Sequence, residues 1–440
     1  MRTQTNRSGF AGACHSVVFP AVVFFLVSVA SGTLMAERPS IPKEDWPWWR
    51  GHHQDGIAVS DQQPPLHWSE TENVRWRVPV EGRGHGSPTV FGGKVLLATA
   101  DPEKQEQAVV SVNRADGRMN WRTVIHSGGF ANKSRNKLNS KASLASSSVA
   151  TDGKRLFVNF MNSNALWTTA LDLNGKIIWQ KRISDYVLHQ GYGASPAIFG
   201  DLVIVSADNK SGGLLAGLNR ETGDTVWQRS RPPKPNYASP VIVRAAGRDQ
   251  LILSGCDLVT SLDPLTGKLL WEIEGATTEC VTSAVTDGVH VFTSGGYPTN
   301  HVSAVKADGS GKVAWQNGSR VYVPSMLQKD GYLYATLDAG IAVCFRCSDG
   351  KEMWKSRLGG TFSSSPVMVG DMIHATNEEG QTFIFRTSPD SFQQIAKNKL
   401  GESVFATPAI CGGHIYTRVA HLEDGERQEY LYCLGDRVER

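Results

Sequence analysis

The sequence predicts an all-β fold, an eight-bladed β-propeller of four-stranded antiparallel blades, and three observations support this prediction. Glycine stands four residues before tryptophan six times, at Gly117, Gly175, Gly223, Gly267, Gly311 and Gly350. Eight units begin with a small residue, mostly a hydroxyl followed by proline, at Ser87-Pro88, Ser147, Ser195-Pro196, Ser239-Pro240, Ser283-Ala284, Pro324-Ser325, Ser365-Pro366 and Thr407-Pro408. Successive tryptophans lie 39 to 58 residues apart, which suits a four-stranded blade, and no helical period separates the strands.

The decad from Leu262 to Trp271 shows the repeat most clearly. It has an apolar run, a turn of Asp, Pro, Thr and Gly, and a strand that ends in the tryptophan. Glycine suits such a turn because it adopts φ > 0 without a steric penalty. A tryptophan at one register of each outer strand is a packing device, since an indole ring buries about 150–250 Å². We therefore assign docking between blades to Trp76, Trp121, Trp179, Trp227, Trp271, Trp315 and Trp354.

Residues 1–36 have the pattern of a secretory signal peptide. Arg2 and Arg7 precede an apolar run from Val17 to Ala30 that is short for a membrane span, and cleavage after Ala30 or after Ala36 would fit. The alternative is a retained anchor. We expect a periplasmic or secreted protein of the cell envelope, with no transmembrane anchor after cleavage.

Residues 37–72 form a predicted N-terminal extension, and residues 73–440 form the propeller. The extension contains Trp46-Pro47-Trp48-Trp49. These rings could make a carbohydrate platform, but the favoured interpretation is a segment packed across the propeller, where it covers a sheet edge or plugs an opening.

The two ends of the repeat array complement each other. The eighth unit stops near Gly435 without a tryptophan strand, whereas the strand from Asn73 to Val78 carries Trp76 and has no unit before it. We expect this N-terminal strand to complete the last blade and so to close the ring.

Six cysteines follow the signal, in a compartment that permits disulfides. Cys256 and Cys280 are the possible disulfide, because both are expected on the channel-mouth face of adjacent blades. Cys344 and Cys347 form a CxxC without a second pair or a nearby histidine, and residues three apart in a strand point to opposite faces. We interpret this pair as structural, with metal or redox chemistry as the alternative.

In a propeller, the crossovers between blades lie on the face of the channel mouth. The predicted crossovers contain 17 Lys and Arg against 6 Asp and Glu, compared with 28 against 36 elsewhere; they are residues 77–86, 122–146, 180–194, 228–238, 272–282, 316–324, 355–364 and 396–406. We expect a basic face that binds an anionic or acidic partner, unless these are merely solvated loops. The expected binding residues are Arg83, His85, Lys133, Arg135, Lys137, Lys141, Tyr192, Tyr237, Tyr322, Phe362 and Phe405.

Several of these residues carry a family resemblance that covers nearly all of the chain after the signal. The hairpins Leu218 to Trp227 and Leu262 to Trp271 look like the repeat of pyrroloquinoline quinone (PQQ) propellers. The opening from Trp46 to Gly51, with Trp76 and the stretch from Gly84 to Pro88, resembles the secreted PQQ-like proteins of planctomycete-type bacteria. The propeller is also similar to BamB, the scaffold subunit of the outer-membrane barrel assembly machinery.

The enzymatic members of that family imply a quinone held in the channel by calcium, an acidic base and a disulfide between adjacent cysteines. The chain has no adjacent cysteine pair, and we identify no Ser/His/acid trio, HExxH or P-loop motif. We expect no catalytic residue, metal or cofactor, and a monomeric, non-catalytic binding or scaffold protein whose partner is an envelope protein or an anionic ligand. Nucleic acid is disfavoured, because the signal directs the chain out of the cytoplasm. The alternative is a PQQ-dependent alcohol or sugar dehydrogenase that uses calcium.

Overall fold

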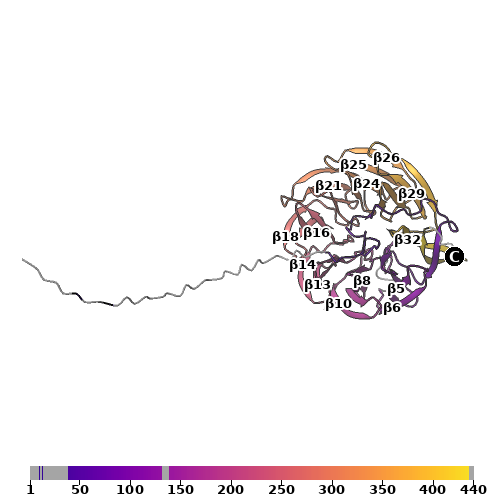
Figure 1. The fold of residues 1–440 in the computed structure, drawn as a ribbon, viewed down its shortest axis with the longest axis horizontal. Coiled ribbons are helices and arrows are strands. Elements are labelled where there is room, and N and C mark those ends of the chain that lie inside the picture. Colours follow the sequence, from indigo (N-terminus) through magenta and orange to yellow (C-terminus); the bar gives the residue numbers. More distant parts are fainter. Residues whose placement is uncertain (1–8, 10–11, 13–37, 131–137, 436–440) are drawn as a thin grey trace, which may run out of the picture. The chain divides into compact units, whose positions relative to one another are not determined.

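The structure is a computed structural model that describes residues 9, 12, 38–130 and 138–435, so the signal segment, apart from residues 9 and 12, lies outside the described residues. Residues 38–435 belong to one compact unit. Their 33 strands form eight sheets arranged around a central channel, as predicted (Figure 1). Innermost strands of neighbouring blades contact one another, and β3 of the first blade contacts β31 of the last. The eight-bladed propeller is therefore confirmed.

The first four blades each consist of four consecutive strands. They comprise β3 (Thr89–Phe91), β4 (Lys94–Asp101), β5 (Glu106–Asn113) and β6 (Met119–Ser127); β7 (Ala150–Thr151), β8 (Arg155–Asn162), β9 (Ala165–Asp172) and β10 (Ile177–Asp185); β11 (Ala197–Phe199), β12 (Leu202–Ser206), β13 (Gly213–Asn219) and β14 (Thr225–Arg231); β15 (Val241–Ala245), β16 (Arg248–Gly255), β17 (Leu258–Leu262) and β18 (Leu269–Glu274).

Blades 5 and 6 follow the same plan, and two N-terminal strands join the last two blades. These comprise β19 (Val285–Thr286), β20 (His290–Gly295), β21 (His301–Lys306) and β22 (Val313–Asn317); β23 (Leu327–Lys329), β24 (Tyr332–Leu337), β25 (Ile341–Arg346) and β26 (Glu352–Arg357); β1 (Ile57–Ala58), β27 (Val367–Val369), β28 (Met372–Thr376), β29 (Gln381–Arg386) and β30 (Gln394–Lys399); β31 (Ala409–Cys411), β32 (His414–Glu423), β33 (Glu426–Leu434) and β2 (Val74–Val80).

Strand β2 closes the ring as the outermost strand of blade 8. It pairs antiparallel with β33, with Trp76 opposite Cys433, and in Figure 1 it lies in violet beside the yellow C-terminal strands. A buried ion pair joins the closed blade to its neighbour. Arg418 pairs with Glu429 within blade 8 and donates to the carbonyl of Ala98 (2.7 Å) in blade 1. The predicted closure by the N-terminal strand is confirmed.

Each hairpin turn is built by its own side chains. In blade 4, Oδ1 of Asp263 accepts the backbone N–H groups of Leu265 (3.0 Å) and Thr266 (2.9 Å), and the N–H of Gly267 donates to the carbonyl of Asp263 (2.9 Å). Gly267 has φ of +66°, and a Cβ placed on it would lie 2.5 Å from the ring of Trp227 in the preceding blade. Five of the six repeated glycines thus serve both the turn and the docking of the preceding blade's indole, whereas Gly311 approaches Ile273 instead.

Six of the seven repeat tryptophans hydrogen-bond to the next blade. Their indole N–H groups donate to turn carbonyls, namely Trp76 to Arg114 (3.0 Å), Trp121 to Leu173 (3.2 Å), Trp179 to Arg220 (3.2 Å), Trp227 to Pro264 (3.2 Å), Trp315 to Cys347 (2.6 Å) and Trp354 to Ser388 (2.7 Å). Trp271 differs because its N–H donates to Gln250 of its own blade (2.8 Å). Gln250 in turn donates to the carbonyl of Ala307 in blade 5 (2.8 Å).

The cysteines are buried thiols. Cys344 packs in the core between blades 6 and 7 and Cys347 in the core between blades 5 and 6, so the two point to opposite faces of their blade. The structure corrects the expected bond between Cys256 and Cys280, because both are free. Sγ of Cys256 donates to the carbonyl of Lys234 (3.3 Å), whereas Sγ of Cys280 lies 3.5 Å from Oγ1 of Thr277, so each thiol has its own polar partner.

Candidate binding site at the channel mouth

Hydroxyl side chains connect the blades around the channel. The backbone N–H at the start of one blade donates to the hydroxyl of the next, in the pairs Ser87 to Ser148 (2.9 Å), Ser148 to Ser195 (2.9 Å), Ser195 to Ser239 (2.9 Å), Ser283 to Ser325 (3.0 Å), Ser325 to Ser365 (2.9 Å) and Ser365 to Thr407 (2.9 Å). We call these eight residues the hydroxyl ring. The sequence placed the member from blade 2 at Ser147, but the structure uses Ser148.

The N-terminal extension crosses the channel below the hydroxyl ring. Its backbone bridges Trp46 to Val90 in blade 1, and β1 pairs in parallel with β27 of blade 7. Between these points, buried Arg50 donates to the carbonyl of Met326 in blade 6 (2.5 Å), and Trp49 donates to Oγ of Ser283 in blade 5 (2.8 Å). Because these contacts span the ring, the extension closes one end of the channel.

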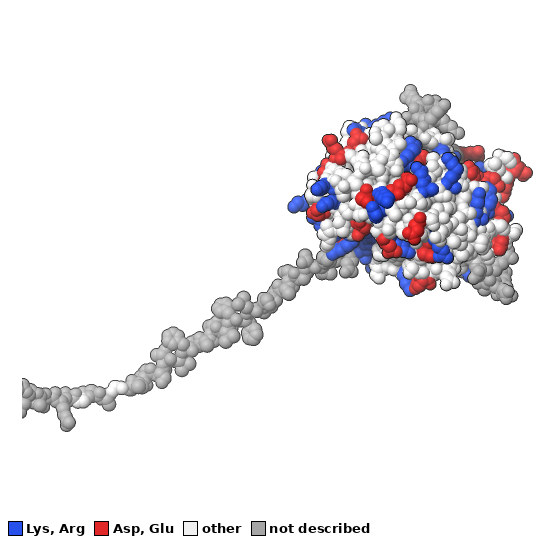
Figure 2. Space-filling model, turned by 90° about the horizontal axis from the view of Figure 1, so that it is seen from above, with Lys and Arg blue, Asp and Glu red and all other residues white. Residues whose placement is uncertain are grey.

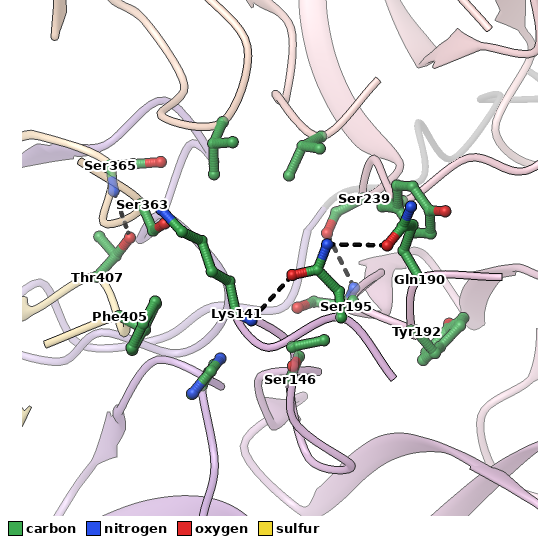
Figure 3. Close-up of a pocket in the computed structure, with 18 of the residues that line it drawn as sticks. Lys141, Ser146, Gln190, Tyr192, Ser195, Ser239, Ser363, Ser365, Phe405 and Thr407 are labelled. Atoms are coloured by element: carbon green, nitrogen blue, oxygen red, sulfur yellow. Dashed lines mark hydrogen bonds between the residues drawn. The ribbon is translucent and has the colours of Figure 1, made fainter. Parts of the chain in front are cut away.

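Above this closure lies a cavity of about 340 Å³, which we call the cup. Trp49 lines its inner end, together with Ser87, Ser195, Ser239, Ser365 and Thr407 of the hydroxyl ring. Each of the eight crossovers supplies at least one wall residue, represented in order by His85, Lys141, Gln190, Tyr237, Val281, Tyr322, Ser363 and Phe405. Figure 3 shows several of these side chains around the open centre.

Most of the sequence-predicted binding residues that the structure describes lie at the cup. His85 stacks on Phe405 with ring centroids 4.4 Å apart. The hydroxyl of Tyr237 lies 2.9 Å from Nδ1 of His189, and the ring of Tyr322 receives the guanidinium of Arg320 at 5.0 Å. The residues just before the first strand of each blade therefore converge on one cavity.

Three expected residues have other roles. Phe362 is fully buried and packs against Phe383 (6.1 Å), outside the cup. Tyr192 touches the cup, but its hydroxyl donates to the carbonyl of Ser206 (3.0 Å) and so serves the core. Arg83 stands behind His85, with Nε 3.3 Å from Nε2 of the imidazole.

The basic crossover is described only in part. Lys133, Arg135 and Lys137 lie outside the described residues. Lys141 extends across the cup toward Ser363 (Figure 3). Its ammonium group pairs with Glu378 of blade 7 at 2.8 Å. On the side of the propeller seen in Figure 2, basic and acidic side chains are intermixed.

Sequence reasoning missed several residues of the cup. Asn139 and Gln190 meet through a hydrogen bond of 2.8 Å between neighbouring crossovers, and Trp49 arrives from the extension. The repeated Ser-Pro pairs were a signal for the hydroxyl ring, but their spacing indicated only where blades begin. No local pattern in the sequence indicates that Trp49 lies beneath the ring.

Burial controls the ionisation of the cup. Burial first, and then the nearby Arg83, Arg418 and Arg427, lower the pKa of His85 well below its usual value, so this imidazole is neutral at pH 7. Burial raises the pKa of Tyr322 to about 12, so its phenol stays protonated. Among the residues that the structure describes, Lys141 is therefore the single charged side chain that lines the cup.

The donor set of the cup does not fit a calcium-bound quinone. Calcium takes six to eight oxygen ligands, usually with carboxylates among them. Within the described part of the chain, no Asp or Glu lines the cup, and no group of three His, Cys, Asp or Glu could hold a metal ion.

The fold and the cup define a class of protein, a closed eight-bladed propeller with a cavity at the channel mouth to which the described part of every crossover contributes. A family profile described as "Outer membrane protein assembly factor BamB" matches residues 26–171, 105–297 and 298–420. The chain belongs to this family of PQQ-like propellers. None of the described residues forms a helix long and apolar enough to span a membrane.

Individual relatives are distant. The chain is 21% identical over 311 residues to the outer membrane protein assembly factor BamB of Yersinia pestis, covering 68% of this chain and 71% of that protein. The BamB structure from Moraxella catarrhalis is similar with a TM-score of 0.57 at 14% identity, over 83% of this chain and 98% of that one. A quinohemoprotein alcohol dehydrogenase from Comamonas testosteroni has a TM-score of 0.63 at 12% identity, over 90% of this chain and 81% of that one. At such identities the structural likeness establishes the fold alone.

Proposed function

We propose that this protein is a non-catalytic binding or scaffold protein of the cell envelope, which holds an acidic partner at the channel mouth. One observation carries the proposal: all eight crossovers and the N-terminal extension contribute to the cup, and its described lining has aromatic rings and hydrogen-bond donors but no carboxylate. A cavity of this composition suits binding, since it lacks both the acidic base and the calcium ligands of a quinone enzyme. The family membership supports an envelope setting.

Site-specific photocrosslinking tests this proposal. A photoreactive phenylalanine at Tyr322, in the cup, should capture a defined envelope partner, whereas the same residue at Tyr332 in β24 should not. Capture should weaken as salt rises, because exposed charges are screened over about 8 Å at physiological ionic strength. Equal capture at both positions would contradict the proposal.

Two further measurements separate the binding function from its alternatives. Replacing Lys133, Arg135, Lys137 and Lys141 with Gln should weaken capture with little change in thermal stability, since surface substitutions usually fall within about 0.5 kcal/mol. Protein mixed with PQQ and calcium should show no dye-linked oxidation of alcohols or sugars. Turnover in that assay would replace the scaffold function with a dehydrogenase.

A further inference from the structure

The hydroxyl ring presents proton donors to the cup. Oγ of Ser195, Ser239 and Ser365 and Oγ1 of Thr407 each accept a backbone N–H from the preceding blade. Their own O–H groups have no acceptor among the residues that the structure describes, and all four side chains line the cup. Because a hydroxyl has one proton to donate, these four groups are available to an acceptor that enters the cup.

The walls add donors of the same kind. The phenol of Tyr322 has no hydrogen-bond partner in the described part of the chain, and the amide of Gln190 uses its oxygen on Asn139 while its NH₂ group remains available. Lys141 donates one of its three N–H groups to Glu378. The cup therefore has an excess of donors that an acceptor-rich ligand would satisfy.

The charge around the cup is uneven, because Glu378 pairs with Lys141 and Glu279 lies 3.4 Å from His189, whereas positive groups gather beside His85. Arg83 lies beside His85 and makes no ion pair with a carboxylate of the described residues. Behind it, Arg418 and Arg427 share the single carboxylate of Glu429. This corner of the mouth, between blades 8 and 1, thus carries an excess of positive charge next to the cup wall.

Aromatic rings provide the apolar part of the site. Trp49 covers the inner end, the stacked pair of His85 and Phe405 forms one wall, and Tyr237 and Tyr322 stand on other crossovers. Such rings bind flat or apolar groups, while the hydroxyls between them fix polar atoms.

We infer that the cup binds a carboxylate carried on an aromatic or apolar body, with the carboxylate oxygens on the hydroxyl ring and the body among the rings. Hydrogen bonds to an ionised acceptor are stronger than those between neutral groups, which favours a carboxylate over a sugar hydroxyl. This inference rests on the proposed binding function and specifies the chemistry that the partner presents. Such a carboxylate can come from the C-terminus of a peptide or from a free aromatic acid.

Calorimetric titration with matched probes tests the inference. N-acetyl-phenylalanine, which imitates a peptide C-terminus, should bind about tenfold more tightly than its carboxamide, because only the acid offers a charged acceptor. Phenylacetate tests the free-acid source in the same experiment. Equal binding of acid and amide, tighter binding of glucose than of either acid, or binding of none of these probes would overturn the inference.

A variant pair ties the binding to the cup. Tyr322→Phe removes a phenol that bonds to no described residue, so the melting temperature should stay unchanged while acid binding weakens about tenfold. Tyr332→Phe removes a phenol on β24, outside the cup, and should leave binding unchanged. An unchanged affinity in Tyr322→Phe would show that the acid does not bind in the cup. If the probes do not bind but crosslinking at position 322 still captures a partner, only the carboxylate inference is overturned and the scaffold function stands. If the acids bind but no partner is captured, the scaffold function is overturned and the carboxylate inference stands.

Discussion

The indole N–H of Trp49 donates to Oγ of Ser283 over 2.8 Å, at a point of the hydroxyl ring where no direct bond joins Ser239 to Ser283. A residue from the N-terminal extension thereby takes part in the ring that joins blades far away in sequence. The extension is consequently a component of the cup, and it positions the indole of Trp49 that closes the inner end of the cup.

Replacing this indole tests the contribution of the extension. Trp49→Phe keeps an aromatic ring but removes the donor, so it should lower the free energy of unfolding by about 1 kcal/mol more than Trp48→Phe. Trp48 is the control because it lies in the same extension and its indole N–H has no hydrogen-bond partner among the described residues; its side chain is buried, whereas that of Trp49 is half-buried. Urea denaturation of both variants measures the difference, and equal losses would show that the bond to Ser283 contributes nothing.

The close approach of Gly267 to Trp227 should make this glycine intolerant of substitution. Gly267→Ala places a Cβ 2.5 Å from the ring at a φ of +66°, so we expect a loss of more than about 2 kcal/mol in stability. Gly247→Ala is the control, because Gly247 has a φ of +75° with open space around its added Cβ. Its cost should be limited to about 1–2 kcal/mol of backbone strain. Similar losses in both variants would mean that the indole moves aside freely.

Arg418 should be more important for ring closure than any exposed charge. Its side chain and that of Glu429 are each 2% exposed, and Arg418 also reaches Thr99 of blade 1 (3.1 Å). Arg418→Met should cost about 3–5 kcal/mol because it leaves Glu429 without this buried partner, and adding Glu429→Met should restore part of that loss. Arg320→Met, which breaks an exposed pair with Asp338, should cost less than about 1 kcal/mol. A small effect of Arg418→Met on thermal unfolding would contradict this account.

Two buried histidines should make the propeller sensitive to mild acid. Burial lowers the pKa of His301 and of His374 to about 4, below the usual 6.5. The unfolded chain therefore binds more protons between these values, and stability falls as pH decreases from about 6.5 toward 4, by up to about 3 kcal/mol for each histidine. In the double variant His301→Gln, His374→Gln, the free energy of unfolding should depend less on pH between 6.5 and 5. An unchanged slope would show that other groups cause the acid sensitivity.

The sequence alone determined the blade repeat, because each repeat depends on residues that lie close together in the chain. A glycine four residues before six of the seven tryptophans forms a turn, and five of these glycines also receive the indole of the preceding blade, as Gly223 receives Trp179. The strand around Trp76 has no repeat unit before it, and this indicated that it closes the ring of blades. The rule that crossovers share a face also predicted that His85, Tyr237, Tyr322 and Phe405 would meet.

Tertiary structure alone decided which distant residues contact one another around the cup. The bond from Trp49 to Ser283 joins positions 234 residues apart, and the pair of Lys141 with Glu378 joins positions 237 residues apart, so no local pattern predicts either. The side-chain direction of Phe362 and the separate partners of Cys256 and Cys280 depend on packing inside adjacent blades. Sequence periodicity determines the elements and their order, because it reflects interactions of each strand with its neighbours in the chain. The shape and donor pattern of the cup arise only when eight crossovers and the extension come together in space.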